Sequence, residues 1–270
     1  MTTADAFEDI KAKQQQTWSS GDYNRIAWLT VPLADRLCDA VDLRPGSRVL
    51  DVATGTGHVA LAAARRFCDV TGIDYVPRLV ETARRRAAAE SLPVRFEEAD
   101  AERLPFADAE FDYVLSAIGV MFTADHRRAA GELVRVCKPG GVIGLLNWTP
   151  EGFVGRLLAT VSGHVPPPAG AQPPVRWGSE EVLRELLGDR VSRLGVERGS
   201  VTQRFLSPEH FASYFVEHYG PTLKAAQRLT EDGRRTFHDD LAAVAEASGR
   251  TDGGALVSDW EYLIAVATRA

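Results

Sequence analysis

Long apolar runs are missing from this sequence of 270 residues. No stretch approaches the roughly 18 uncharged apolar residues of a membrane-spanning helix, so we expect no membrane partner. The first residues, MTTADAFEDIKAKQQQTW, are polar and charged, and they lack the apolar segment of a secretory signal. These two absences predict a cytoplasmic protein.

Cysteine is scarce, and there is no excess of positive charge. Cys38, Cys68 and Cys137 lie far apart, and none belongs to a CxxC pair or a Cys/His cluster. We therefore expect buried thiols rather than disulfides or a metal site. The formal net charge of −6 gives no electrostatic reason to expect a nucleic-acid partner, because phosphate binding requires a basic face.

Short apolar runs alternate with amphipathic segments in the first half of the chain, which predicts a parallel α/β sheet. The expected strands are 49–52, 70–73, 94–97, 111–116 and 142–147, and the expected helices are 59–67, one that starts at Pro77, and 125–137. The glycines of KPGG (138–141) are expected to end the last of these helices.

The rest of the chain is predicted to be mostly helical. We expect helices within 5–45 and at 153–165, 179–187 (with Ser179 as N-cap), 208–229 and 231–247, a sixth strand within 191–206 and a seventh at 261–268. The whole is an α/β fold: a Rossmann-like, seven-stranded, mostly parallel sheet with helices on both faces. We expect an N-terminal helical cap (1–45), an α/β core (46–206), a helical substrate lid (207–254) and the last strand of the core (255–270).

The stretch VLDVATGTGHVA (49–60) places a carboxylate, Asp51, inside a strand that should be buried. An unpaired carboxylate in a dry core is costly, but near a strand end it can accept hydrogen bonds from loop amides or from a ligand ammonium. The small residues 53–57 let a ligand approach the backbone, and the helix that begins at His58 offers N–H groups to an anion. These features suit the zwitterionic head of methionine, although a tight turn with a solvated Asp51 also explains them.

Carboxylates follow two further strands. Asp74, in GIDY, can accept both hydroxyls of a ribose, and Asp100, in EEADAERLPF, can read an adenine edge beside a backbone N–H. FDYVLSAIGVMF (111–122) adds a flat apolar strand exit. Asp74 and the loose glycine pattern GTGHVA (55–60) suit a nicotinamide cofactor as well, which leaves an NAD(P)-dependent oxidoreductase as an alternative.

Five motifs occur in order between Val49 and Ile143: VLDVATGTG, GIDY, DAERLPF, FDYVLS and LVRVCKPGG. This segment resembles the core of class I S-adenosylmethionine-dependent methyltransferases. Within them it is most similar to the type 11 group that includes the ubiquinone and menaquinone biosynthesis C-methyltransferases. The resemblance implies S-adenosyl-L-methionine (SAM) as the cofactor and methyl transfer as the reaction.

The resemblance also implies roles by position. Asp51 is expected to orient the loop and the methionine ammonium, Asp74 to bind the ribose diol, and Asp100 to read the adenine edge. The other residues implied to line the cofactor are Ala53, Thr54, Gly55, Gly57, Tyr75, Ala101, Glu102 and Ser116. Ala53 departs from the family, which often has glycine there, and alanine fits if its φ angle is negative.

In related enzymes the N-terminal helices cover the cofactor, so Trp18 and Tyr23 are candidates for contacts with its sulfonium or carboxylate. Packing of both rings in the cap explains them equally well. Methyl transfer depends mainly on alignment and exclusion of water, and no catalytic residue is assigned. His126 is the best-placed candidate for a base, with a surface position beside a capping Asp125 as the favoured alternative.

The acceptor is expected to be a small molecule, methylated on O, N or C, in secondary metabolism or quinone-like chemistry. The sequence lacks the Asn/Asp-Pro-Pro-aromatic turn, the Pro-Cys pair and the clustered carboxylates used for nucleobases and metal-assisted catechols. A homodimer is compatible with the sequence. A non-catalytic SAM-binding protein is a second alternative.

Overall fold

The computed structural model describes the backbone of residues 3–270 and the side chains of residues 7–270. The predicted cap begins with residues 1–2, which lie outside the described part. The chain folds as two compact units. Of the described residues, the helical unit comprises 3–30, 148–171 and 200–262, and the sheet unit comprises 31–147, 172–199 and 263–270.

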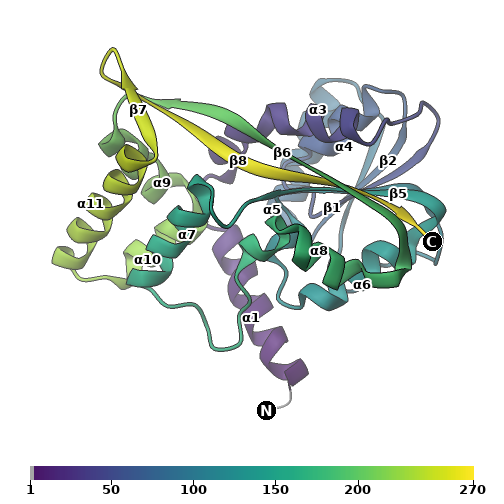
Figure 1. Cartoon of the computed structure of the whole chain (residues 1–270), viewed down its shortest axis with the longest axis horizontal. Helices are drawn as coiled ribbons and strands as arrows, with labels where there is room; N and C mark the ends of the chain where they lie inside the picture. Colours follow the sequence, from purple (N-terminus) through teal and green to yellow (C-terminus); the bar gives the residue numbers. More distant parts are fainter. Residues whose placement is uncertain (1–2) are drawn as a thin grey trace. The chain divides into compact units, whose positions relative to one another are not determined.

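A parallel sheet forms the centre of the sheet unit (Figure 1). Its strands are β1 (Arg48–Val52), β2 (Asp69–Asp74), β3 (Val94–Glu98), β4 (Phe111–Ala117) and β5 (Cys137–Trp148), joined by parts of β6 (Val191–Phe205) and β8 (Ala255–Arg269). The strand order is β3-β2-β1-β4-β5-β8-β6, and β1 to β5 pair in parallel. Parallel pairing brings the carboxyl ends of β1, β2 and β4 to one edge of the sheet.

Helices cover the sheet because its strands are apolar on both faces. They are α3 (Val31–Ala40), α4 (His58–Ala64), α5 (Pro77–Ala89), α6 (His126–Val136) and α8 (Glu180–Leu187), with 3-10 turns η2 (Val120–Phe122), η3 (Pro174–Gly178) and η4 (Gly188–Arg190). α3 packs on α4 and α6 packs on α8, on opposite sides of the sheet in Figure 1. Leu50, Ile73 and Leu115 are fully buried between these layers.

Aromatic side chains make the core of the helical unit. This unit contains α1 (Thr3–Trp18), α2 (Tyr23–Ala27), η1 (Trp28–Thr30), α7 (Phe153–His164), α9 (Pro208–His218), α10 (Gly220–Arg228), α11 (Glu231–Ala247), β7 (Gly249–Asp252) and the remaining parts of β6 and β8. Trp260 stacks on Phe153 at a centroid distance of 5.1 Å, and the rings of Phe211 and Phe215 meet Trp260 edge-on. Such ring pairs bury a large apolar area and favour defined geometries.

The segment KPGG (138–141) does not end a helix as expected, because it lies inside β5. Pairing with β4 changes from Phe111↔Cys137 to Tyr113↔Val142, so β5 advances by five residues where β4 advances by two. Gly140 has φ +73°, a conformation that glycine adopts without strain. The glycines therefore make a bulge that lets the strand start earlier.

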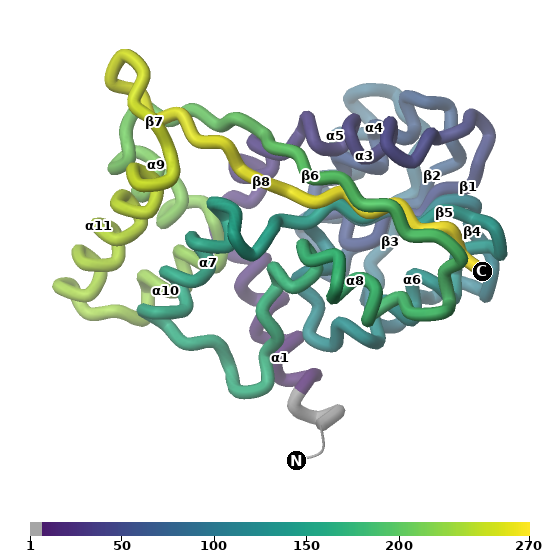
Figure 2. Tube along the Cα trace, in the orientation of Figure 1, coloured from purple at the N-terminus to yellow at the C-terminus, as the bar shows by residue number. Residues whose placement is uncertain are grey.

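The end of the chain also differs from the expectation. β8 starts at Ala255 and forms an antiparallel hairpin with β7, which the sequence analysis missed. The turn residues Gly253 and Gly254 both have positive φ, as two-residue hairpin turns require. The sheet thus has eight strands in the described chain rather than seven. β6 and β8 run side by side along the trace (Figure 2).

One helix prediction was wrong in detail. The helix expected over 208–229 is split into α9 and α10, because Tyr219 adopts an extended backbone before Gly220 and Pro221 start the second helix. Ser179 is the N-cap residue of α8 as predicted, although its side chain makes no capping hydrogen bond. No helix within residues 3–270 is long and apolar enough to cross a membrane.

Candidate functional site

Asp51 is the most deeply buried carboxylate at the carboxyl edge of the sheet. It lies one residue before the end of β1 and is 1% exposed. Its Oδ2 accepts hydrogen bonds from the Thr54 hydroxyl at 2.5 Å and from the Ala60 N–H at 3.0 Å. Its Oδ1 accepts none from any residue that the structure describes. One oxygen therefore holds the loop to α4, and the other remains available to a ligand donor.

The loop 53–57 turns so tightly that Ala53 adopts φ +55°, so the condition of a negative φ for alanine at this position is not met. The Thr54 N–H donates to the Ile73 carbonyl at 2.8 Å, which holds the loop against the end of β2. Gly119 approaches from the end of β4, and a Cβ on Gly119 would lie 2.7 Å from the Ala53 Cβ. A left-handed alanine costs about 1 kcal/mol, so the loop carries local strain.

Substitution at Ala53 tests this geometry. Ala53→Gly is expected to keep the free energy of unfolding within about 1 kcal/mol, because relief of strain and the greater entropy of the unfolded chain offset each other. Ala53→Val is expected to lower it by roughly 2–3 kcal/mol, because a β-branched residue at positive φ clashes with its own backbone and with Gly119. Urea denaturation of both variants measures the difference. A valine variant as stable as the parent would contradict the positive φ.

Asp74 joins the ends of β2, β1 and β3. Its Oδ2 accepts the Gly55 N–H at 2.9 Å, and its Oδ1 accepts the Val76 N–H at 2.9 Å. Its carbonyl accepts the Ala99 N–H at 3.1 Å, which brings the exit of β3 against that of β2. Each carboxylate oxygen has a second lone pair, so Asp74 can still accept two hydroxyl groups.

Tyr75 marks where the carboxylates converge. Burial raises its pKa, and the nearby charges of Asp74, Asp100 and Glu102 raise it further. Asp74 is also close enough to Asp51 to affect its titration. The structure therefore brings the candidate carboxylates of three strand exits into one cluster beside the small-residue loop.

Burial raises the pKa values of two carboxyl groups at this edge of the sheet. Burial raises the pKa of Asp51 to about 7, against the stabilising hydrogen bonds from Thr54 and Ala60. Burial likewise raises the pKa of Asp74 to about 6, against the backbone bonds from Val76 and Gly55. A ligand that brings positive charge or hydroxyl donors will favour the ionised form of both groups.

Other predicted site residues have well-defined structural partners. Asp100 accepts the Glu102 N–H at 2.9 Å, which shapes the turn around the buried Ala101. Glu102 accepts the N–H groups of the two residues before α6 at 2.7 and 2.9 Å. The Ser116 hydroxyl donates to the Val52 carbonyl at 2.7 Å and accepts the Val120 N–H. Glu102 and Ser116 thus anchor the rim of the cluster.

Sequence reasoning missed several residues at this edge. Arg86 donates to the Thr56 carbonyl at 2.6 Å and supports the loop from α5, which no local pattern indicated. Ile118 adopts φ +57°, an outlier for a β-branched residue, and it donates its N–H to the Leu146 carbonyl at 2.7 Å. Asn147, at the end of β5, is fully buried, and its side-chain amide bonds to no described residue.

His126 is buried, so the surface position favoured for it is wrong. It is 1% exposed at the start of α6, and neither ring nitrogen makes a hydrogen bond within the described residues. Its ring meets Trp177 edge-on at 5.7 Å. Burial, together with the charge of Arg176, lowers the pKa of His126 to about 4. Asp125 does cap α6, because its carboxylate accepts the Arg128 N–H at 3.0 Å.

Trp18 and Tyr23 belong to the helical unit, whereas the residues of the carboxylate cluster belong to the sheet unit. Their rings meet edge-on at 5.6 Å, and Trp18 also contacts Tyr219 at 5.8 Å. Packing therefore accounts for both, and their contact with a cofactor stays a prediction. His164 likewise pairs with Asp240 at 2.7 Å, and the Tyr214 hydroxyl donates to a backbone carbonyl.

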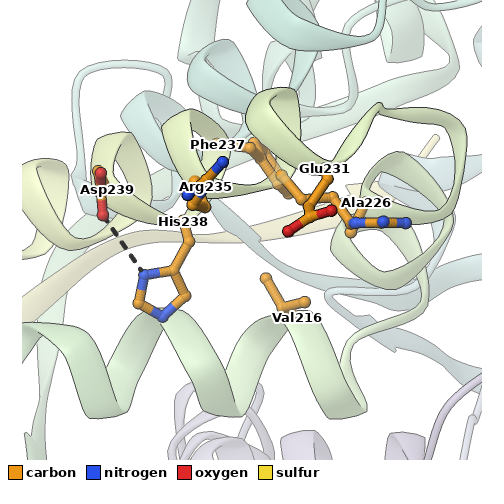
Figure 3. Close-up of a pocket in the computed structure, with 8 residues that line it drawn as sticks. Val216, Ala226, Glu231, Arg235, Phe237, His238 and Asp239 are labelled. Atoms are coloured by element: carbon orange, nitrogen blue, oxygen red, sulfur yellow. Dashed lines mark ion pairs between the residues drawn. The ribbon is translucent and has the colours of Figure 1, made fainter.

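A second group of reactive side chains borders an open hollow of about 350 Å³ in the helical unit. Figure 3 shows His238 and Asp239 at its wall. The Ser213 hydroxyl lies 2.9 Å from one ring nitrogen of His238, but Asp239 lies 3.8 Å from the other, beyond hydrogen-bond range. Ser213 stands inside α9, where backbone N–H groups are already bonded and offer no oxyanion hole. The group ties α9 to α11 and forms no hydrolytic site.

The carboxylate cluster fits a ligand with an ammonium, a diol and a base. Asp51 keeps one unbonded oxygen, Asp74 keeps free lone pairs, and the loop 53–57 presents backbone rather than bulky side chains. The donors that such a ligand carries match the acceptors that remain at the edge. The residues present therefore fit an adenosyl amino acid.

Comparisons with known proteins agree with this fit. A family model described as a methyltransferase domain matches residues 49–141. An uncharacterized protein of Mycobacterium tuberculosis is 41% identical over 99% of this chain and 98% of its own length. The demethylmenaquinone methyltransferase of Thermus thermophilus is 40% identical over 54% of this chain and 70% of its own. The YcgJ protein of Bacillus subtilis has the same fold, with a TM-score of 0.62 and 19% identity over 89% of this chain and 97% of that one.

These matches and the sheet topology define a Rossmann-like methyltransferase fold. The chain belongs to the S-adenosylmethionine-dependent methyltransferases, and its cofactor is SAM. The α/β fold class, the family and the cofactor predicted from the sequence are thereby confirmed.

Proposed function

We propose that the protein transfers the methyl group of SAM to an O, N or C atom of a small molecule. The observation that carries this proposal is the convergence of Asp51, Asp74 and Asp100 beside the loop 53–57, with acceptor capacity left on the first two carboxylates. The absence of sequence motifs for nucleobase acceptors favours a small molecule. We place this activity in the cytoplasm and in a biosynthetic pathway.

Each candidate residue has a proposed role in holding the cofactor. Asp51 accepts the methionine ammonium through its unbonded Oδ1, and Asp74 accepts the ribose diol. Asp100 and the backbone at Ala101 contact the adenine, with Tyr75 beside it. The other proposed lining residues are Ala53, Thr54, Gly55, Gly57, Glu102 and Ser116, together with Trp18 and Tyr23 of the cap.

The cap (1–45) and the lid (207–254) are proposed to act together on the acceptor side. Within the helical unit, a Cβ on Gly21 would lie 2.4 Å from the His218 carbonyl oxygen, so the two segments touch backbone to backbone. Trp18 and Tyr219 pack across the same contact. The lid and the part of the cap before Val31 belong to the same compact unit, so we propose that these two segments move as one piece when substrate enters.

When bound, SAM would supply a methyl group on a sulfonium sulfur, which departs as a neutral thioether. The residues of this chain then need to orient the donor, seat the acceptor and exclude water. The buried ends of β4 and β5 favour this role, since Ile118 holds a strained backbone and Asn147 keeps an unbonded amide. We propose that Asn147 contacts the acceptor.

His126 is proposed to be structural rather than a general base. A buried imidazole with a pKa near 4 takes up protons poorly at neutral pH. His126→Leu is expected to keep the methylation rate within about threefold and to leave stability unchanged or raised by roughly 1 kcal/mol, because two unbonded buried polar atoms are removed. Urea denaturation and initial rates measure both effects. A loss of rate with normal SAM affinity would instead assign His126 to the chemistry.

The direct test is a screen for uptake of labelled methyl from SAM. The panel contains phenols, quinones, amines and carboxylic acids, and quinones are included because one relative is named a demethylmenaquinone methyltransferase. Label in a product together with S-adenosylhomocysteine supports the proposal. Tight SAM binding without turnover on any acceptor would favour the non-catalytic alternative, and tight NAD(H) binding without a response to S-adenosylhomocysteine would favour an oxidoreductase.

A further inference from the structure

β6 ends the sheet, and residues 191–199 are its part in the sheet unit. No other strand of the described chain pairs with β6 besides β8. Residues 191–199 are all exposed or half-exposed. Farther along, the Gln203 side chain donates to the Leu29 carbonyl, so a neighbouring segment flanks β6 there. A free edge strand offers backbone N–H and C=O groups to a further strand.

The sequence of this edge is complementary to itself. Arg193 and Glu197 stand two residues before and two residues after Gly195, and Leu194 and Val196 stand next to it on either side. When two such strands pair antiparallel about Gly195, each Arg193 faces a Glu197, and each Leu194 faces a Val196. Opposite charges and apolar side chains placed directly across a pair of strands are favourable.

The side chains needed for this pairing are available. Arg193 and Glu197 are exposed, and neither forms an ion pair with any described residue. Alternation along a strand puts these two side chains on the same face as Gly195, and puts Leu194 and Val196 on the other. A Cβ on Gly195 would meet only the Val266 carbonyl oxygen, at 4.0 Å, so the strand is open to close approach.

We propose that the protein forms a homodimer in which β6 of one copy pairs antiparallel with β6 of a second copy, centred on Gly195. The two sheets then continue into each other across a two-fold axis. Nine paired residues span about 30 Å. Such a narrow contact buries less than the roughly 1,200 Å² of a standard interface, so the dimer is weak and concentration-dependent.

Charge reversal tests the register. Sedimentation across a concentration series is expected to show a monomer–dimer equilibrium that Glu197→Arg or Arg193→Glu weakens at least about tenfold, because like charges then face each other. The double variant R193E/E197R is expected to restore it. Glu246→Arg, at an exposed position of α11, is the matched control and is expected to leave association unchanged. A monomer at every concentration, or a dimer indifferent to the single reversals, overturns the proposal.

A cysteine at the two-fold axis gives a second test. Opposed residues of antiparallel strands have Cα atoms about 4.5–5.5 Å apart, within the range of a disulfide. Gly195→Cys is therefore expected to form a covalent dimer on mild oxidation, while the native Cys38, Cys68 and Cys137 are buried. Ser192→Cys is the control, since copies of that residue lie far apart in this register. Equal cross-linking of both variants, or none at Gly195→Cys, contradicts the pairing.

Discussion

Asp51→Asn is expected to weaken SAM binding by about 100-fold or more while the fold survives. Asparagine keeps the size of the side chain and one acceptor for Thr54 and Ala60, but it places no negative charge beside the cofactor ammonium. Loss of one partner of a buried charge pair typically costs 2–5 kcal/mol of binding free energy, which is on the order of 30- to several-thousand-fold in affinity. Calorimetry with SAM and with S-adenosylhomocysteine measures the change.

The same variant is expected to stabilise the free protein at alkaline pH. The pKa of Asp51 is about 7 in the folded protein and 3.8 in the reference state, so between these values the folded state binds more protons than the unfolded state. Wild-type stability due to this group therefore falls as pH rises through that window. Asparagine has no charge to bury, so its advantage should reach roughly 1–3 kcal/mol at about pH 8 and vanish at about pH 4.

Asp69→Asn is the matched control. Asp69 begins β2 at the opposite edge of the sheet, where it is exposed and pairs with Arg95 at 3.3 Å. Its substitution should leave SAM affinity unchanged, which separates a local effect from a general loss of negative charge. An Asp51→Asn protein that binds SAM as tightly as the parent would remove Asp51 from the cofactor site. A variant that unfolds at every pH would show that the charge itself is needed for folding.

SAM affinity is expected to fall as pH falls. In the free protein the pKa of Asp51 is about 7 and that of Asp74 about 6. In the proposed complex, the donors of the cofactor draw both groups into the ionised form. Below these values, binding must first remove protons. Affinity should therefore be on the order of 30- to 100-fold weaker at about pH 5.5 than at about pH 7.5, while the cofactor amine stays largely protonated.

Proton release provides the second readout for this linkage. At about pH 6.5, SAM binding should release close to one proton, seen as a binding enthalpy that depends on the ionisation enthalpy of the buffer. Asp74→Asn should reduce both the released protons and the pH slope, whereas Asp69→Asn should change neither. An affinity that is flat between these pH values would mean that the two carboxylates do not bind the cofactor as ionised groups.

Local sequence patterns predicted much of the fold because helix periodicity and turn preferences depend on neighbouring residues. The helix expected to start at Pro77 is α5, which begins at that residue and buries Leu79, Val80, Ala83 and Ala87 at the spacing of one helix face. Asp51, Asp74 and Asp100 could be placed at one edge because parallel strands align their carboxyl ends. The order of the motifs then indicated the family, since most of the motifs contain a strand together with the site residues at its end.

Predictions were wrong where a distant segment decides the outcome. His126 reads as a surface residue from its neighbours, but Trp177, 51 positions later, covers it. The left-handed Ala53 depends on the approach of Gly119, and the bulge in β5 depends on its register with β4. The hairpin β7–β8 was missed because two consecutive glycines, such as Gly253 and Gly254, also occur where a strand ends without forming a hairpin.

The sequence by itself determined the alternation of strands and helices, the chemistry at the strand ends and the membership in the methyltransferase family. Those features depend on residues within about one element, whose periodicity and turn preferences are local. Only the tertiary structure decided which backbone is strained, which carboxylates are buried enough to titrate near neutral pH, and which polar atoms remain unbonded. Those properties arise from desolvation and close packing by segments far apart in the chain, which no local pattern encodes.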